Sequence, residues 1–322
     1  MSDALNRTGV AGHSAPASDA TGRLIAAIDA VNRVVLGKTG QVELAFASLL
    51  AGGHLLIEDL PGVGKTTLAH AIAIVTGGRW QRIQFTNDLL PADIVGVSIW
   101  RSADERFEFR PGPVFANVVL ADEINRATPR TQSALLEAMA EQQVSVDGHT
   151  HALPKPFFVI ATQNPLDLVG TYPLPDSQLD RFLLRISLGY PDPAQERALL
   201  TQPDRREILS NLLPILSPED VLTLRGQTEA LHVSEPVLDY VQALVQATRE
   251  HAALRAGLSP RAALALLRTA RAHALLQAQD FVLPDNVKQV FPALAMHRLQ
   301  CRPNTGETGD VVDQILDETR VP

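Results

Sequence analysis

The segment EDLPGVGKTT (residues 58–67) constrains the fold of this chain more than any other stretch. It follows the apolar residues 54–57 and leads into a helical pattern that starts near Leu68. Two glycines allow the backbone to curl until several N–H groups point at one phosphate. Lys65 can then reach the outer phosphates, and the Thr66 hydroxyl can ligate Mg²⁺. The positive end of the helix adds to the same anion site. The sequence therefore predicts a nucleotide-binding strand–loop–helix unit.

The predicted nucleotide contacts of this loop are Pro61, Gly62, Val63, Gly64, Lys65, Thr66 and Thr67. The strict phosphate-loop pattern has glycine at position 59, where this chain has aspartate. That departure lies where the chain enters the loop and outside the binding core, so we expect phosphate binding to be retained.

Composition limits the protein to a few classes. The chain has 322 residues, 45% of them apolar, with no apolar run near twenty residues and no signal pattern at its start, so we expect no membrane insertion and a cytoplasmic location. A single cysteine, Cys301, excludes internal disulfides and agrees with a reducing compartment. The net charge of −8 argues against a nucleic-acid partner, because nucleic-acid binders usually carry a basic face.

Two further apolar runs end in polar residues that suit phosphate chemistry. Residues 117–121 predict a strand that is buried on both faces of a parallel sheet, and Asp122 and Glu123 follow at its carboxyl end. With a phosphate loop upstream, Asp122 is expected to hold Mg²⁺ and Glu123 to polarise the attacking water. Residues 157–161 predict a second buried strand that leads to Asn164. Its amide can orient water, but Asn-Pro also starts ordinary turns, and the residues alone leave both roles open.

Two hairpins and a helical region complete the pattern. Alternation in residues 97–100 and 107–109 predicts one hairpin, either a plain surface hairpin or a working loop, and Asp147-Gly148 predicts another. After a last strand at residues 183–188, the pattern is helical. The expected helices are 194–202, 217–230, 234–251, 260–278 and 284–298.

These observations predict an α/β fold followed by an all-helical unit. The expected organisation is a disordered tail (1–20), an α/β nucleotide-binding core (21–192), a helical lid (193–305) and a C-terminal tail (306–322).

Taken together, the motifs resemble the AAA+ ATPases and, within them, the MoxR group. The matching stretches are EDLPGVGKT (58–66), LADEINRA (120–127), TQSALLEAM (131–139), ATQNP (161–165), GTYPLP (170–175), QLDRF (178–182) and SPRAA (259–263). The resemblance covers roughly residues 30–300.

The resemblance implies a P-loop core built on a five-stranded parallel sheet, with ATP bound between the core and a helical lid. It gives Asn164 the role of water-positioning sensor and Arg261 that of lid sensor. Arg181 matches the arginine finger that is presented to a neighbouring subunit's ATP. Residues 87–113 resemble the insert in the second helix, and residues 144–153 resemble the hairpin before the sensor strand.

The resemblance further implies homo-oligomeric rings, usually hexamers, that act as chaperone-like motors on client proteins. Family partners often carry a von Willebrand factor A domain. We therefore expect an Mg²⁺-dependent ATPase that matures or remodels client complexes. Two alternatives are the motor subunit of a magnesium-chelatase-type or helicase-type machine and an ATP-sensing module without turnover. Whether Arg261 acts within its own subunit, and whether Arg126 or Arg130 shares the finger role, are open from the sequence.

Overall fold

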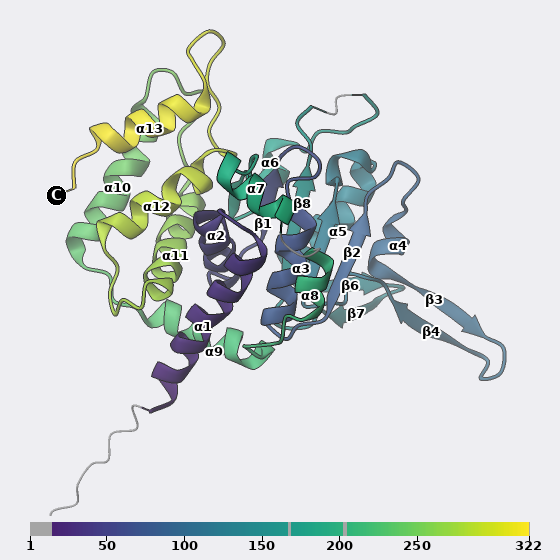
Figure 1. The fold of residues 1–322 in the computed structure, drawn as a ribbon. Coiled ribbons are helices and arrows are strands. Elements are labelled where there is room, and N and C mark those ends of the chain that lie inside the picture. The colour runs from purple at the N-terminus through teal and green to yellow at the C-terminus, as the bar shows by residue number, and fades with distance from the viewer. Residues whose placement is uncertain (1–14, 167–168, 202–204, 322) are drawn as a thin grey trace, which may run out of the picture.

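The central element of the fold is a parallel β-sheet. The computed structural model describes residues 15–166, 169–201 and 205–321. In this part of the chain, five strands are arranged in the order β2-β5-β8-β1-β9, with every neighbouring pair parallel (Figure 1). The strands are β1 (Leu55–Glu58), β2 (Trp80–Gln84), β5 (Val118–Asp122), β8 (Phe158–Gln163) and β9 (Leu184–Ile186). The predicted five-stranded parallel sheet is confirmed.

Each face of the sheet has its own hydrophobic core, because successive residues of a strand point to opposite faces. Leu120 and Ile160 belong to one core, and Val119 and Val159 belong to the other. The helices of the first core include α1 (Ala15–Val34), α2 (Thr39–Leu50) and α3 (Lys65–Val75), and buried residues of the helical region after the sheet, between positions 221 and 315, belong to it as well. The second core contains residues of α4 (Pro91–Val95) and α5 (Pro129–Glu141). This burial on both faces explains the unbroken apolar runs of the central strands.

Parallel pairing brings the carboxyl ends of the strands together. Ala121 pairs with Ala161, so that Asp122 and Thr162 follow side by side. Glu58 pairs with Gln163 on the other side of β8, immediately before the phosphate loop. The loop, the acidic pair and the end of β8 therefore share one edge of the sheet.

Both predicted hairpins are present as antiparallel pairs outside the main sheet. Strand β3 (Gly96–Arg101) pairs with β4 (Arg106–Pro111), and this hairpin projects from the body of the protein (Figure 1). Strand β6 (Gln143–Val146) pairs with β7 (His149–Ala152). The rings of Phe109 and His151 stack with centroids 3.9 Å apart, so the two hairpins contact each other.

The region after the sheet is helical, as predicted. Two short helices lie within the α/β part, η1 (Ile124–Arg126) and α6 (Asp176–Leu179). The later helices are α7 (Pro193–Thr201), α8 (Arg205–Ser210), α9 (Pro218–Ala230), α10 (Glu235–Glu250), α11 (Pro260–Leu276), α12 (Pro284–Ala295) and α13 (Thr308–Glu318). Several begin with proline, which suits the first helical position because no hydrogen bond is lost there. Ser259 caps α11 by accepting a hydrogen bond from the Ala262 N–H.

The two predicted tails need correction where the structure describes them. Helix α1 begins at Ala15, and Ala20 is buried, so residues 15–20 are helical; residues 1–14 lie outside the described part. Residues 308–318 form α13, whose Val311, Val312 and Ile315 are buried and which contacts α10 and α12. The spacing of these three side chains makes one apolar stripe on a helix, and burying it against the lid explains why this segment is ordered. Among the described helices, none has the length and apolar character needed to cross a membrane.

Two buried histidines predict how stability changes with pH. Burial lowers the pKa of His54 to about 4 and that of His297 to about 3. His54 Nε2 donates to the Met139 carbonyl and His297 Nε2 to that of Phe182, so each ring is held as a neutral donor. In the unfolded chain both histidines regain their ordinary pKa of 6.5. Between pH 6.5 and 4, the unfolded chain therefore binds more protons than the folded one.

We expect acidification from pH 7 to pH 5 to lower the free energy of unfolding, by up to about 1.4 kcal/mol per pH unit for each histidine. Urea unfolding at the two pH values measures the change. His297→Gln should flatten the dependence, because glutamine takes up no proton, whereas substitution of the exposed His149 should not. An unchanged slope in His297→Gln would contradict this explanation.

Candidate functional site

A cavity of about 350 Å³ lies at the carboxyl edge of the sheet. It brings together most of the residues that the sequence predicted. Its lining comprises Pro61, Gly62, Gly64, Lys65, Thr66, Thr67, Arg82, Asp122, Glu123 and Asn164. A second cavity adjoins the loop and shares Pro61, Gly62, Gly64 and Thr67 with the first. Apart from the loop, including Val63, it is lined by Val35, Leu36, Lys38, Tyr190, Pro191 and Glu196.

The loop backbone is shaped for close approach by a ligand. Gly62 and Gly64 have φ angles of +83° and +101°, which L side chains rarely adopt. Among the described residues, apart from the adjacent ones in the chain, no heavy atom lies within 4 Å of the position a Cβ would take at either glycine. Helix α3 begins at Lys65, and the Leu68 N–H donates to the Gly64 carbonyl at 3.0 Å. The N–H groups that come before Leu68 in the first turn have no acceptor within the helix. Such groups are suited to bind an anion at the helix N-terminus.

Lys65 is folded back onto the loop. Its Nζ donates to the carbonyl oxygens of Asp59 at 2.7 Å and Leu60 at 3.0 Å. Partial burial lowers the pKa of Lys65, while the charges of Asp59, Asp122 and Glu123 act in the opposite direction. The ammonium group of Lys65 thus lies in the cavity near acidic side chains, and it binds the carbonyl groups at the start of its own loop.

Asp122 is buried at the end of β5, and both of its oxygens accept hydrogen bonds. Oδ1 accepts from the Thr162 hydroxyl at 2.6 Å. Oδ2 accepts from Arg82, at 2.5 Å from Nη2 and 3.2 Å from Nε. Thr162 also accepts from the Glu123 N–H at 2.9 Å, so one hydroxyl joins the two acidic residues.

Glu123 has a backbone φ of +57°, in the left-handed region that is uncommon for a non-glycine residue. Its Oε2 accepts from Gln84 Nε2 at 2.9 Å and pairs with Arg126 Nε at 3.2 Å. Asn164 follows β8 on the same edge of the sheet, and its Oδ1 accepts from the Leu166 N–H at 3.1 Å. The carboxylate and the amide thus line one cavity with the loop.

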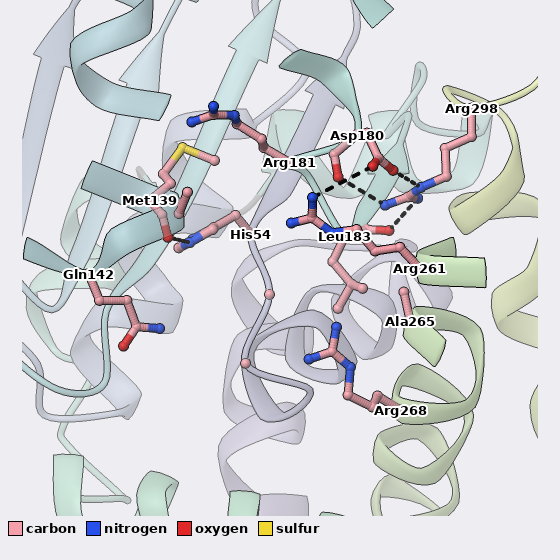
Figure 2. Close-up of a pocket in the computed structure, with 13 residues that line it drawn as sticks. His54, Met139, Gln142, Asp180, Arg181, Leu183, Arg261, Ala265, Arg268 and Arg298 are labelled. Atoms are coloured by element: carbon pink, nitrogen blue, oxygen red, sulfur yellow. Dashed lines mark hydrogen bonds and ion pairs between the residues drawn. The ribbon is translucent and has the colours of Figure 1, made fainter. Parts of the chain in front are cut away.

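Arg181 and Arg261 line a different cavity, of about 220 Å³, together with Arg268, Arg298 and Asp180. Figure 2 shows Arg261 and Arg298 directed at Asp180, while Arg181 extends away from it. Arg261 Nη1 lies 4.0 Å from Asp180 Oδ2, and its side chain is 72% exposed. Arg181 Nη1 donates to the Leu136 carbonyl at 2.6 Å. The structure therefore separates the predicted site residues into two groups, one around the loop and one around Asp180.

Three residues outside the sequence prediction hold these groups in place. Arg82 contacts Asp122, as described above. Arg298 is 7% exposed and donates to Asp180 Oδ1 at 2.8 Å and to the Phe182 carbonyl at 2.7 Å, which ties the lid to the segment that carries Arg181. Asp59 joins the loop to the chain after β9. Only Asp59 gave a sequence signal, because it departs from the loop pattern.

Asp59 accepts hydrogen bonds on both carboxylate oxygens. Oδ2 accepts from the Leu188 N–H at 2.6 Å, the Gly189 N–H at 2.7 Å and the Ser187 hydroxyl at 3.1 Å. Oδ1 accepts from the Leu60 N–H at 2.8 Å. Asp59 therefore anchors the start of the phosphate loop to the segment that follows β9.

We expect Asp59→Asn to lower the free energy of unfolding by about 2–3 kcal/mol. The asparagine amide has no negative charge, and its NH₂ group would face N–H and O–H groups that themselves need an acceptor. Nucleotide affinity should fall with it. Urea unfolding and a nucleotide titration measure the two effects. Asp239→Asn, at an exposed position of α10, is the matched control. Equal stability of Asp59→Asn and the control would show that the anchor is unimportant.

The sequence and the fold have close relatives. Residues 54–184 match the ATPase family associated with various cellular activities (AAA), and residues 246–319 match the AAA lid domain. The chain is 44% identical over 300 residues to YeaC of Bacillus subtilis, covering 92% of this chain and 94% of that protein. It is 42% identical over 307 residues to Chaperone MoxR1 of Mycobacterium tuberculosis, covering 89% and 80%. A crystal structure from Cytophaga hutchinsonii superposes with a TM-score of 0.85 at 36% identity, covering 94% of this chain and 96% of that one.

Proposed function

The chain belongs to the MoxR-type AAA+ ATPases, and on this basis we propose that it is an Mg²⁺-dependent ATPase that remodels or matures client protein complexes. One observation carries the proposal. The phosphate loop, Asp122, Glu123 and Asn164 line a single cavity at the carboxyl edge of the sheet. Phosphate binding, metal binding and water activation need groups of these kinds within reach of one another.

The residues present fit a magnesium ion. The Thr66 hydroxyl and the Asp122 carboxylate lie in the same cavity and supply the oxygen ligands that this hard cation prefers. When bound, Mg²⁺ neutralises charge that develops on the phosphates. Lys65 would exchange its two loop carbonyls for the outer phosphates, and the loop N–H groups would hold the remaining oxygens.

Glu123 is proposed as the base and Asn164 as the residue that orients the attacking water. Glu123 directly follows the proposed metal ligand Asp122 at the edge of the sheet, and its backbone is left-handed there. The second cavity beside the loop suits the adenine base, because Val35, Leu36, Tyr190 and Pro191 give it apolar walls.

Arg181 is proposed to act as an arginine finger on the nucleotide of a neighbouring subunit in a homo-oligomeric ring, expected to be a hexamer. Arg261 is proposed to act as the lid sensor, and its side chain is 72% exposed beside the same cavity around Asp180. Arg126 is paired with Glu123 of its own chain, so we assign it to its own site. Arg130 lies exposed at the start of α5 and serves as the comparison variant for the finger role.

The client is proposed to be another protein, which can include partners with a von Willebrand factor A domain, and the work is proposed to take place in the cytoplasm. The relative named Chaperone MoxR1 supports a role on proteins. Against a helicase-type motor, β6–β7 carries two histidines and no lysine or arginine. The β3–β4 hairpin has three arginines, and two of them lie near acids: Arg101 pairs with Glu108, and Arg106 lies 3.8 Å from Asp104.

We expect the purified protein to release phosphate from ATP only with Mg²⁺, and single- or double-stranded DNA to leave the rate unchanged. Phosphate release should be measured with and without DNA at low salt, where electrostatic binding is strongest. A several-fold stimulation that disappears with added salt would favour the helicase-type motor. Tight nucleotide binding without any phosphate release would favour the ATP-sensing module.

A further inference from the structure

Arg82 lies inside the nucleotide cavity although it belongs to no nucleotide-binding motif. It is the third residue of β2 and lines the cavity with Lys65, Asp122 and Glu123. Its side chain is 48% exposed, whereas that of Asp122 is 11% exposed. The guanidinium group can therefore change position without opening the core, while the carboxylate that it contacts is fixed.

The two oxygens of Asp122 differ in what holds them. Oδ1 is bound by the Thr162 hydroxyl, which is itself buried and fixed by the Glu123 N–H. Oδ2 is bound by two nitrogens of the half-exposed Arg82. Oδ2 is consequently the oxygen whose partner can be exchanged for another. Its present partner, the guanidinium group of Arg82, is positively charged, as a metal ion would be.

The same guanidinium group connects the metal ligand to the base. Arg82 Nη2 also donates to Gln84 Oε1 at 2.9 Å, and Gln84 Nε2 donates to Glu123 Oε2 at 2.9 Å. This contact fixes the Gln84 amide with its oxygen toward Arg82 and its nitrogen toward Glu123. Asp122, Arg82, Gln84 and Glu123 thus form one chain of charge-assisted hydrogen bonds, which are stronger than neutral ones.

We infer that Arg82 is a positioning residue that stands in for magnesium on Asp122 and leaves Oδ2 when the ion and nucleotide bind. Its departure removes the partner of Gln84 Oε1 and loosens the contact that holds Glu123. Arg82 thereby couples occupation of the metal site to the position of the base. The inference rests on the proposed function, since it assumes that magnesium and ATP bind in this cavity.

The experiment measures how strongly magnesium and nucleotide assist each other. The dissociation constant of a fluorescent, non-hydrolysable ATP analogue is determined for the full chain in EDTA and at saturating Mg²⁺. The ratio of the two constants is the coupling factor between the ion and the nucleotide. In the wild type, part of the free energy that magnesium contributes to nucleotide binding is used to displace Arg82 from Asp122. The coupling factor of Arg82→Ala should therefore rise, by about tenfold if one charge-assisted contact is removed.

Two variants make the result specific. Arg79→Ala removes the same charge from an exposed position just before β2 and should leave the coupling factor unchanged. Arg82→Lys keeps the charge but cannot place two nitrogens on Oδ2, so its coupling factor should lie between those of wild type and Arg82→Ala. A variant that merely folded poorly would not gain coupling.

An unchanged or smaller coupling factor in Arg82→Ala would overturn the inference. If Arg82 only bound a phosphate of the nucleotide, Arg82→Ala would raise both dissociation constants by the same factor and leave their ratio constant. If the wild type binds the analogue with magnesium assistance but the ratio does not respond to Arg82, the inference alone fails. If the wild type binds no analogue under either condition, the proposed function fails and the inference fails with it.

Discussion

Glu123→Gln should retain ATP and lose turnover by about 10²–10⁴-fold, because the amide keeps the shape of the side chain but cannot accept a proton from water. The contacts around Glu123 favour a folded variant. Its N–H donates to Thr162, and Gln84 and Arg126 lie beside its carboxylate. Phosphate release and nucleotide binding, measured on the same preparation, separate the two effects.

The matched control is Glu137→Gln, which makes the same substitution at an exposed position of α5 and should leave both measurements unchanged. Hydrolysis at the normal rate in Glu123→Gln would show that another group activates the water. Loss of ATP binding would instead mean that Glu123 serves the shape of the site rather than the reaction.

Arg181→Ala should lower the rate of hydrolysis by about 10³–10⁵-fold, which is the effect expected of an arginine that neutralises charge developing on the transferred phosphate. Within its own chain Arg181 donates to the Leu136 carbonyl at 2.6 Å, so it must leave that contact to reach a neighbour's nucleotide. Its neighbour Asp180 is paired with Arg298. Steady-state phosphate release measures the loss.

A structural role for Arg181 would give a different result. Removing a helix-to-loop hydrogen bond would lower the free energy of unfolding and leave the rate of the folded protein near normal. Urea unfolding of Arg181→Ala therefore accompanies the rate measurement. Arg130→Ala is the comparison variant, and a larger loss of rate in Arg130→Ala than in Arg181→Ala would transfer the finger role to Arg130.

The sequence predicted the fold and one side of the site because the relevant signals are local. Continuous apolar runs marked β1, β5 and β8 of the parallel sheet, and the glycines with Lys65 marked the loop. Parallel strands align their carboxyl ends, so Asp122 and Asn164 were expected at the same edge as the loop. The structure places these side chains around one cavity, while their chemical roles stay predictions.

The sequence could not predict contacts between distant segments. Asp59 binds residues about 130 positions later in the chain, and Arg82 binds Asp122 from the neighbouring strand. Neither contact follows from a motif, because each depends on how the strands are ordered in the sheet. The same holds for the separation of Arg261 from the loop, which depends on how the lid packs through Arg298. The helix at residues 308–318 was missed because its apolar stripe is only three residues long.

We propose that ATP is hydrolysed at a site shared by two subunits. Mixing Arg181→Ala with Glu123→Gln subunits tests it most directly, because each variant is expected to be nearly inactive alone. In mixed rings, some interfaces join an intact Glu123 to a neighbour's intact Arg181. Subunit exchange is verified first with two differently labelled preparations. We predict that the mixture recovers part of the wild-type rate of phosphate release. A mixture that exchanges subunits and stays as inactive as its components would contradict the shared site and place Arg181 within its own subunit.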